Sequence, residues 1–318
     1  MLGIPDAYVG YAAGLTTSVL WTGTSLLFTA ASRRLGPTVT NAVRIVFATI
    51  LLAVTHRLLS GTWIPNAATG QIVLLALSGL VGLSLGDQAL FIAFVRIGPR
   101  LAMLIETAAP LFAALLGWLV LGETISPIAW LGIACTVTGV AWVVLERPEQ
   151  QAEAPRGHRL SGIILAFVAA ACQAGGLLLS KQGMGYGWLP KERWLDPQTA
   201  TFVRLFFAAL GMVPIMGVWW LRQGRRQTAS APAIPRGSRG TGVLFAFAGA
   251  VGGPYLGVWL SLVAARHAPL GVAQTLMALP PVLILPLVWL IHKERVSLRA
   301  AIGALVAVGG VALLFVQA

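Results

Sequence analysis

The sequence predicts an all-α polytopic membrane protein in which ten transmembrane helices form two inverted five-helix repeats. Three observations predict this fold: an apolar composition, ten apolar segments of spanning length, and an internal repeat. Of the 318 residues, 57% are hydrophobic and 10% are charged, against about 25% charged in an ordinary soluble domain. A soluble domain has too little interior to bury this much apolar surface. A disordered chain needs low hydrophobicity, so both classes are excluded.

Ten apolar segments are long enough to cross a bilayer, because a spanning helix needs about 20 residues. They cover residues 8–32, 37–59, 71–95, 99–121, 126–146, 160–183, 198–221, 242–266, 269–291 and 296–316. The polar linker 147–159 divides the chain into a first repeat, residues 1–146, and a second repeat, residues 160–318. The other long polar stretch, residues 222–241, is too short to form a soluble domain.

The two halves of the chain share a series of motifs in the same order. Pro37-x6-Arg44 recurs as Pro197-x6-Arg204. At a constant shift of 171 residues, Gly82, Gly86, Pro110, Trp118, Glu123, Ser126, Gly132 and Gly139 correspond to Gly253, Gly257, Pro281, Trp289, Glu294, Ser297, Gly303 and Gly310. Each copy holds five segments, and because five is odd, the second copy enters the membrane from the opposite side. Inverted repeats of this kind are typical of secondary transporters.

These motifs resemble the EamA domain of the drug/metabolite transporter superfamily. The resemblance rests on Gly86-Asp87, Ile97-Gly98-Pro99-Arg100, Pro110-Leu111-Phe112, Leu121-Gly122-Glu123, Gly132 and Gly139, and on their second copies. It covers nearly the whole chain and implies ten transmembrane helices and a carrier that exports or exchanges small metabolites. The second copy departs from the pattern at His292-Lys293, which stands where the first has Leu121-Gly122.

Three charged residues of the first repeat are expected inside the membrane, where a charge is costly unless it is paired or hydrated. Arg44, Asp87 and Glu106 lie at similar distances from one face, about 9 to 14 Å deep at 1.5 Å per residue. One acid can neutralise Arg44 by a bidentate contact. The other acid is then expected to hold a proton at some stage of the cycle. This chemistry suits a proton-coupled exporter, and also a cationic or zwitterionic substrate whose amine replaces the proton.

The repeat distinguishes the arginines from the acids. Arg204 is the second copy of Arg44, whereas Asp87 and Glu106 correspond to Val258 and Met277. We interpret the arginines as structural and the acids as functional, because a symmetric structural need would keep symmetric residues. The alternative is a closed pair between Arg44 and one acid, with the second acid facing a polar cavity; such a pair fixes register without adding stability.

Other polar and aromatic residues are candidates for the substrate path. They are Trp21 and Thr22 in the first segment, Gln173 in the sixth, Tyr255 and Trp259 in the eighth, and Gln274 in the ninth. An aromatic face can hold a cation, although a buried indole or phenol often serves only in packing. Pro110, Pro280 and Pro281 are expected to break helical hydrogen bonding, as hinges or as fixed kinks. Glu123 and Glu294 are expected at helix ends, as caps or turn residues.

The net charge of +12 fits contact with anionic lipid headgroups, and no nucleic-acid partner is expected. The face with loops at 33–36, 96–100, 147–159, 222–241 and 292–299 carries 15 Lys and Arg, and the opposite face carries Arg57, Lys181, Lys191, Arg193 and Arg266. The positive-inside rule then places both termini outside. The family resemblance implies both termini inside, and the two orientations stay open.

Enzymes and metal-binding proteins need particular residues at their sites, and the sequence can be searched for them. No metal-ligand cluster is present, and the two cysteines, Cys135 and Cys172, lie in apolar runs as packing residues. Residues 84–87 read Ser-Leu-Gly-Asp, which does not supply the paired acids of an intramembrane aspartyl protease. We therefore expect no enzyme, metal or cofactor. The prediction is a multi-pass protein of a cell membrane, such as the bacterial inner membrane, that acts as a monomer or homodimer on a small molecule. The alternative is a lipid-moving or small-ion channel protein.

Overall fold

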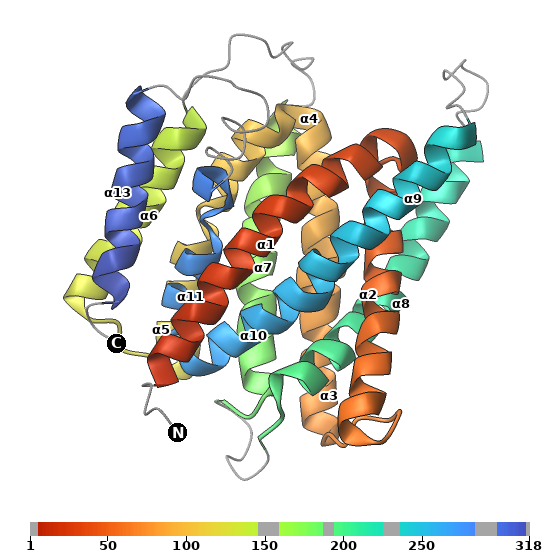
Figure 1. The fold of residues 1–318 in the computed structure, drawn as a ribbon, viewed down its shortest axis with the longest axis horizontal. Coiled ribbons are helices and arrows are strands. Elements are labelled where there is room, and N and C mark those ends of the chain that lie inside the picture. Colours follow the sequence, from red (N-terminus) through yellow and green to blue (C-terminus); the bar gives the residue numbers. More distant parts are fainter. Residues whose placement is uncertain (1–5, 146–158, 187–193, 225–235, 284–297, 316–318) are drawn as a thin grey trace.

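The computed structural model describes residues 6–145, 159–186, 194–224, 236–283 and 298–315, and every regular element in these ranges is a helix (Figure 1). In the first half these are α1 Asp6–Leu35, α2 Pro37–Ser60, α3 Thr69–Ser78, the π-helix η1 Gly79–Gly86, α4 Asp87–Glu106, α5 Ala109–Leu121 and α6 Pro127–Leu145. In the second half they are α7 Arg159–Gly183, α8 Pro197–Gly224, α9 Arg236–Ala250, the π-helix η3 Val251–Gly257, α10 Val258–His267, α11 Leu270–Met277 and α13 Leu298–Phe315.

Proline and glycine set several helix ends. Pro37 begins α2 directly after Gly36, whose φ is 83°, and Gly61 ends α2 with a φ of 76°. Gly122 ends α5 with a φ of 66°. Positive φ is strained for residues with a Cβ, and proline is well suited to the first helical turn because its missing N–H would have no intrahelical partner. The chain therefore reverses sharply at these points.

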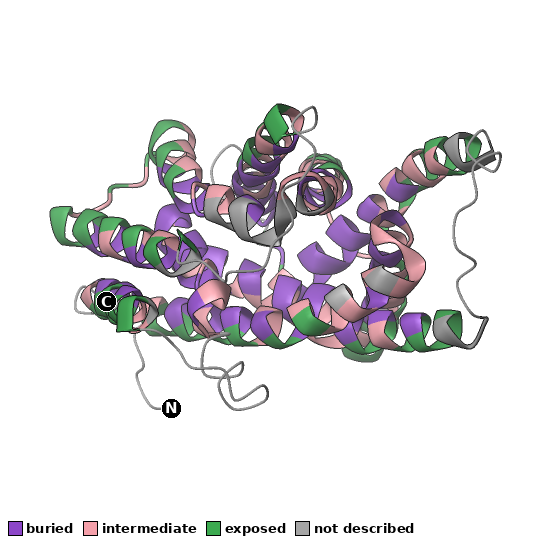
Figure 2. Ribbon diagram, turned by 90° about the horizontal axis from the view of Figure 1, so that it is seen from above, coloured by how far each residue is buried: buried purple, intermediate pink, exposed green. Residues whose placement is uncertain are grey.

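Five helical stretches are long and apolar enough to cross a membrane. They are Pro37–Ser60, Thr69–Ala93, Arg159–Gly183, Pro197–Leu221 and Arg239–His267. Four shorter apolar helices accompany them: Ala109–Leu121, Pro127–Trp142, Leu270–Leu283 and Ala301–Leu314. Large apolar side chains such as Val213, Trp220 and Leu244 are exposed on the outside of the bundle, while buried residues concentrate between the helices (Figure 2). This distribution fits a multi-pass membrane protein surrounded by lipid.

Corresponding elements of the two halves pack reciprocally. Helix α7, the first of the second half, packs on α3, η1 and α4, and α1 packs on α9, η3 and α10 in the same way. The second helices of each half, α2 and α8, contact one another, as do the fifth helices, α6 and α13. The elements of one half therefore complete the packing of the other, and the bundle is a single interleaved unit.

The same two irregularities occur in both halves. The π-helix η1 spans Gly79–Gly86 and η3 spans Val251–Gly257, which is the same stretch of the repeat at a shift of 171 residues. The fourth segments are also broken at equivalent points. Leu111 N–H donates to the carbonyl of Ala108 at 3.1 Å, and its counterpart Val282 donates to Leu279 at 2.9 Å. Both irregularities therefore belong to the repeated unit, since they occur in corresponding segments of the two halves.

The structure corrects one predicted boundary. The expected turn between the third and fourth segments, at residues 96–98, is helical, because α4 continues from Asp87 to Glu106. The break at Thr107 and Ala108, just before Pro110, is a separate interruption within the fourth segment. Helix-breaking was expected at Pro110 and at Pro280 and Pro281, and the chain is indeed interrupted next to each.

Some predicted features lie outside the described residues. These are most of the linker 147–159, part of 222–241, the end of the segment 269–291, and Lys191, Arg193, Trp289, His292, Lys293, Glu294 and Ser297.

Candidate functional site

An ion pair between Arg44 and Asp87 lies inside the bundle. Arg44 projects from the second turn of α2, and Asp87 is the first residue of α4, directly after the π-helix η1. Arg44 Nη2 contacts Asp87 Oδ2, and both side chains are buried, with 10% and 11% exposed. Because a π-helix shifts the side chains that follow it around the helix axis, η1 helps to aim Asp87 at α2.

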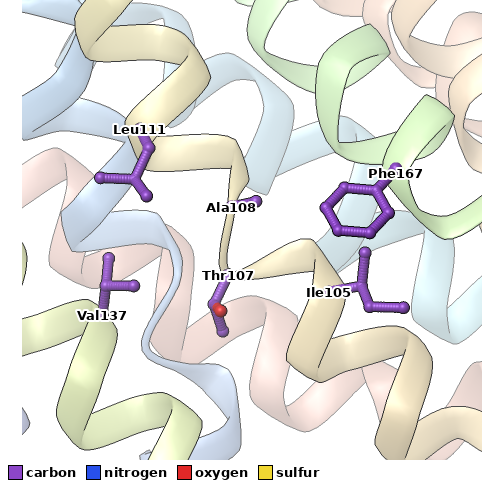
Figure 3. Close-up of a pocket in the computed structure, with 6 residues that line it drawn as sticks. All are labelled: Ile105, Thr107, Ala108, Leu111, Val137 and Phe167. Carbon is purple, nitrogen blue, oxygen red and sulfur yellow. The ribbon is translucent and has the colours of Figure 1, made fainter.

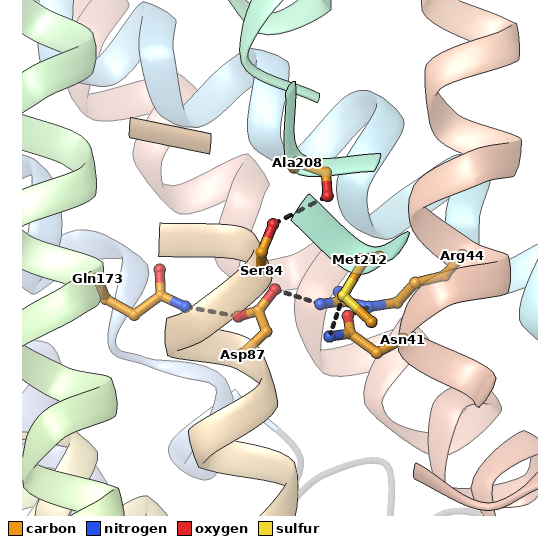
Figure 4. A network of polar contacts seen from close by, with 7 residues as sticks. All are labelled: Asn41, Arg44, Ser84, Asp87, Gln173, Ala208 and Met212. Atoms are coloured by element: carbon orange, nitrogen blue, oxygen red, sulfur yellow. Dashed lines mark hydrogen bonds and ion pairs between the residues drawn. The ribbon is translucent and has the colours of Figure 1, made fainter. Parts of the chain in front are cut away.

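Both carboxylate oxygens of Asp87 have a donor. Arg44 donates to Oδ2 and Gln173 of α7 donates from Nε2 to Oδ1 at 2.6 Å (Figure 4). Arg44 is fixed in turn by Asn41, whose Oδ1 accepts from Arg44 Nε at 3.0 Å. Two donors, one of them a cation, stabilise the ionised carboxylate. Asp87 is therefore the acid that neutralises Arg44.

Glu106 is the second acid, and its surroundings are different. It is the last residue of α4, immediately before the break at Thr107. Its Oε2 is buried and has no hydrogen-bond partner among the described residues. A buried carboxylate oxygen without a donor is costly when ionised, which sets Glu106 apart from Asp87.

Arg204 occupies the place of Arg44 in the second repeat but has different contacts. It lies in α8 with 3% of its surface exposed, and its Nε has no partner among the described residues. Its Nη2 lies so close to Gly82 that a Cβ on that glycine would be 2.8 Å away. Gly82 belongs to η1, which leads directly into Asp87. Arg44 and Arg204 therefore both lie beside the segment that ends at Asp87.

The remaining candidates form separate contacts. Tyr255 of η3 shares a hydrogen bond of 2.8 Å with Thr55 of α2, and its ring lies 6.3 Å from that of Trp259. The indole Nε1 of Trp21 lies against Gly257, where a Cβ would be 2.4 Å away. Thr22 donates to the carbonyl of Ser18 in its own helix at 2.7 Å.

Gln274 is buried in α11. Among these uncharged candidates, Gln173 is joined by a hydrogen bond to the Arg44–Asp87 ion pair. This pair is called the ionic cluster below.

The family comparison agrees with this architecture. The EamA-like transporter family matches residues 8–145 and again 160–316, which is nearly the whole chain. The chain belongs to the EamA-like transporter family. No curated protein matches it. A crystal structure of another protein superposes on this EamA-like chain with a TM-score of 0.72 and 18% sequence identity over 97% of each chain, and it supports the fold alone.

Sequence reasoning missed several residues that hold the ionic cluster of this EamA-like transporter. Asn41 precedes Arg44 by three positions, a spacing that brings helical side chains together and could have predicted the contact. Arg44 also lies under two aromatic rings, with its Cζ 5.2 Å from the ring centres of both Phe28 and Phe91. Those rings come from α1 and α4, so only the tertiary structure brings them to the guanidinium.

Lys181, which the sequence placed among the cations of one membrane face, lies in the last turn of α7. Its side chain is 8% exposed and its Nζ lies 2.5 Å from Glu123 Oε1. Glu123 was expected as a cap or turn residue. Its other oxygen, Oε2, accepts from the N–H of Leu270 at 2.7 Å, and Leu270 is the first residue of α11. Glu123 therefore caps a helix of the other half.

Two further features of the structure are a buried histidine and an apolar recess. His56 is buried in α2, and its Nδ1 lies 3.2 Å from Gln198 Oε1. An apolar recess of about 240 Å³ lies at the break between α4 and α5 (Figure 3). It is lined by Ile105, Thr107, Ala108, Leu111, Val137 and Phe167. The recess thus flanks the segment that carries Glu106.

Proposed function

We propose that this EamA-like protein is a proton-coupled secondary transporter that exports or exchanges a small metabolite by alternating access, with Glu106 as the residue that binds and releases the proton. The supporting observation is the buried Oε2 of Glu106, which has no donor among the described residues. Such a group is more stable when protonated. Binding of a cation, or contact with water on one side, would favour release of the proton.

Asp87 has a different role in this proposal. Its two oxygens accept from Arg44 and Gln173, so it joins α4 to α2 and α7. Asp87 is thus a positioning residue, and the exchangeable proton belongs to Glu106.

The architecture that we propose has ten membrane spans arranged as two inverted five-helix repeats, residues 1–146 and 160–318. The reciprocal packing of α7 on η1 and of α1 on η3 supports it, because each half is completed by the other in the same way. The breaks before Pro110 and Pro281 also support it, since interrupted helices in corresponding places surround the binding site of many transporters.

The proposed substrate is a cation or zwitterion, such as an amino-acid-like metabolite, whose amine replaces the proton on Glu106. Trp21, Tyr255 and Trp259 offer aromatic faces that attract a cation. Arg204, with an Nε that has no partner among the described residues, would suit a carboxylate. A lipid bilayer and a small molecule are the expected partners, and the proposal includes neither enzymatic activity nor a cofactor.

A second candidate function is the movement of lipid or small ions. The apolar recess beside Thr107 favours it, because an acyl chain could enter there. Counterflow distinguishes the two functions: preloaded unlabelled substrate accelerates entry of label in a carrier but not in a channel. A lipid-moving protein would exchange labelled phospholipid in liposomes without any dependence on a pH gradient.

The test begins with a thermal-shift screen of metabolites on the purified protein, because a ligand raises apparent stability with its own concentration. Uptake of each ligand is then measured in liposomes with and without a pH gradient. Glu106→Gln is expected to abolish the response to the gradient. The matched control is Asp196→Asn, which removes an exposed acid. A Glu106→Gln variant that responds to the gradient like the unchanged protein would overturn the proposal.

A further inference from the structure

A buried ion pair joins the two halves at one end of the molecule. Glu123 lies just after α5 in the first half, and Lys181 lies in the last turn of α7 in the second half. Their charged atoms are 2.5 Å apart, with 14% and 8% of the side chains exposed. The Arg44–Asp87 pair, by contrast, lies within the first half. The Glu123–Lys181 pair is therefore a direct charged link between segments of different halves.

The same two side chains also hold the turn between α10 and α11. Lys181 Nζ donates to the carbonyl of Ala268 at 2.7 Å, and Glu123 Oε2 accepts from the N–H of Leu270 at 2.7 Å. One carboxylate and one ammonium thus fasten three segments: the end of α5, the end of α7, and the start of α11. Gly117 makes room for the carboxylate, because a Cβ there would be 2.5 Å from Glu123 Oε2.

These contacts lie at the end of the bundle where the chain begins and ends. Gly10 in α1 packs on His267 and Ala268, and Leu314 in α13 packs on Gly132 of α6. Figure 1 shows the first turn of α1 and the last turn of α13 at this end, near the lower ends of α5 and α10. The linked segments therefore lie together at one end of the bundle.

We propose that the Glu123–Lys181 ion pair is a gate, which holds this end of the transporter closed and breaks each time the end opens. A buried ion pair suits such a role because its attraction is largely offset by the loss of hydration. When the segments part, both charges regain water, so opening is less costly than exposing an apolar contact of equal size. The gate rests on the proposed function, because only a transporter that works by alternating access needs one. The test below uses neither a substrate nor a pH gradient.

Gln182 supplies a second observation at this end. It follows Lys181, is fully buried, and has no partner for either amide atom among the described residues. Buried amides are almost always hydrogen-bonded. An amide that gains water when the gate opens would recover these bonds. A probe at position 182 should therefore detect when this end of the bundle opens to water.

The experiment measures the accessibility of a cysteine at this position. Cys135 and Cys172 are the two cysteines of the chain, and both are replaced by alanine. Gln182→Cys is then introduced, and the protein is reconstituted in nanodiscs, where a water-soluble maleimide reaches both faces. The labelling rate reports the fraction of time for which this end is open.

We expect Glu123→Gln to raise the labelling rate by about tenfold, within the usual range of conformational coupling. Lys181→Met should have the same effect. The double variant Glu123→Gln/Lys181→Met contains no unpaired buried charge, but it lacks both the ion pair and the hydrogen bond from Lys181 to Ala268, so it should also label rapidly. The matched control is Asp196→Asn. Asp196 is also an acid that caps a helix, accepting from the N–H of Thr199 at 2.9 Å, but it makes this bond within the second half and should leave the rate unchanged.

Three outcomes would overturn the gate. They are an unchanged rate in Glu123→Gln, a normal rate in the double variant despite rapid labelling in the single ones, and rapid labelling in the Asp196→Asn control. The second would mean that an unpaired charge, not the broken link, loosens the helices. If labelling behaves as expected while liposomes show no pH-driven transport, the gate stands and the proposed proton coupling fails.

Discussion

Gly132 and Gly310 face one another across the contact between α6 and α13, each without room for a side chain. A Cβ on Gly132 would lie 2.8 Å from the carbonyl oxygen of Gly310, and a Cβ on Gly310 would lie 2.7 Å from that of Gly132. The fifth helices of the two halves therefore approach closely through glycine, as is common for helices in membranes.

This contact predicts a sharp difference between two neighbouring glycines of α13. Gly310→Ala should destabilise the protein by about 1 to 3 kcal/mol, the usual effect of overpacking, because backbone and Thr136 atoms occupy the space. Gly309→Ala should be neutral or slightly stabilising, since no atom lies within 4 Å of its Cβ position and alanine favours helix. Thermal unfolding in detergent measures both. Equal effects at the two positions would contradict the close contact.

A second prediction separates the stability roles of the two acids. Asp87→Asn should destabilise the protein by about 3 to 5 kcal/mol, because Arg44 would be left buried without its counter-charge. Glu106→Gln should change stability by less than about 1 kcal/mol, since Oε2 has no hydrogen bond to lose among the described residues. Thermal unfolding of the two purified variants gives the comparison. Greater destabilisation by Glu106→Gln would mean that the roles are reversed.

A third prediction concerns the packing of η1 against α8. Gly79→Ala should unfold or severely destabilise the protein, because its Cβ would lie 2.1 Å from the backbone oxygen of Arg204, and neither backbone can move easily. Gly175→Ala in α7 is the matched control, with no atom within 4 Å of its Cβ position. The yield of monodisperse protein from membranes, followed by thermal unfolding, distinguishes the two. A well-folded Gly79→Ala variant would show that η1 does not press on α8.

A fourth prediction tests the aromatic residues as a cation site. Tyr255→Phe loses the 2.8 Å hydrogen bond to Thr55, which should cost about 1 kcal/mol of stability, but it keeps the ring. Substrate affinity in Tyr255→Phe should therefore stay within about threefold, whereas Trp259→Leu should weaken binding of a cationic ligand by about 0.5 to 2 kcal/mol. Ligand titration by thermal shift measures both. Normal affinity in Trp259→Leu would remove this residue from the site.

Much of the fold could be predicted from local patterns. The length of each apolar segment and the order of the repeated motifs indicated a multi-pass protein with two similar halves, and the family match over residues 8–145 and 160–316 agrees. The boundary at residues 96–98 was wrong because Gly98 and Pro99 favour a turn when taken alone. In the folded protein α4 continues through them and breaks later, at Thr107.

The sequence by itself determined that the chain is helical, belongs in a membrane, and contains charged residues at depth, because apolar length and repeated motifs are properties of neighbouring residues. Only the tertiary structure decided that Arg44 pairs with Asp87, that Glu106 has an oxygen without a partner among the described residues, and that Lys181 is buried against Glu123. These contacts join helices that are 43 and 58 residues apart in the chain. Their energies depend on burial and on the exact neighbours of each charge, which packing alone determines.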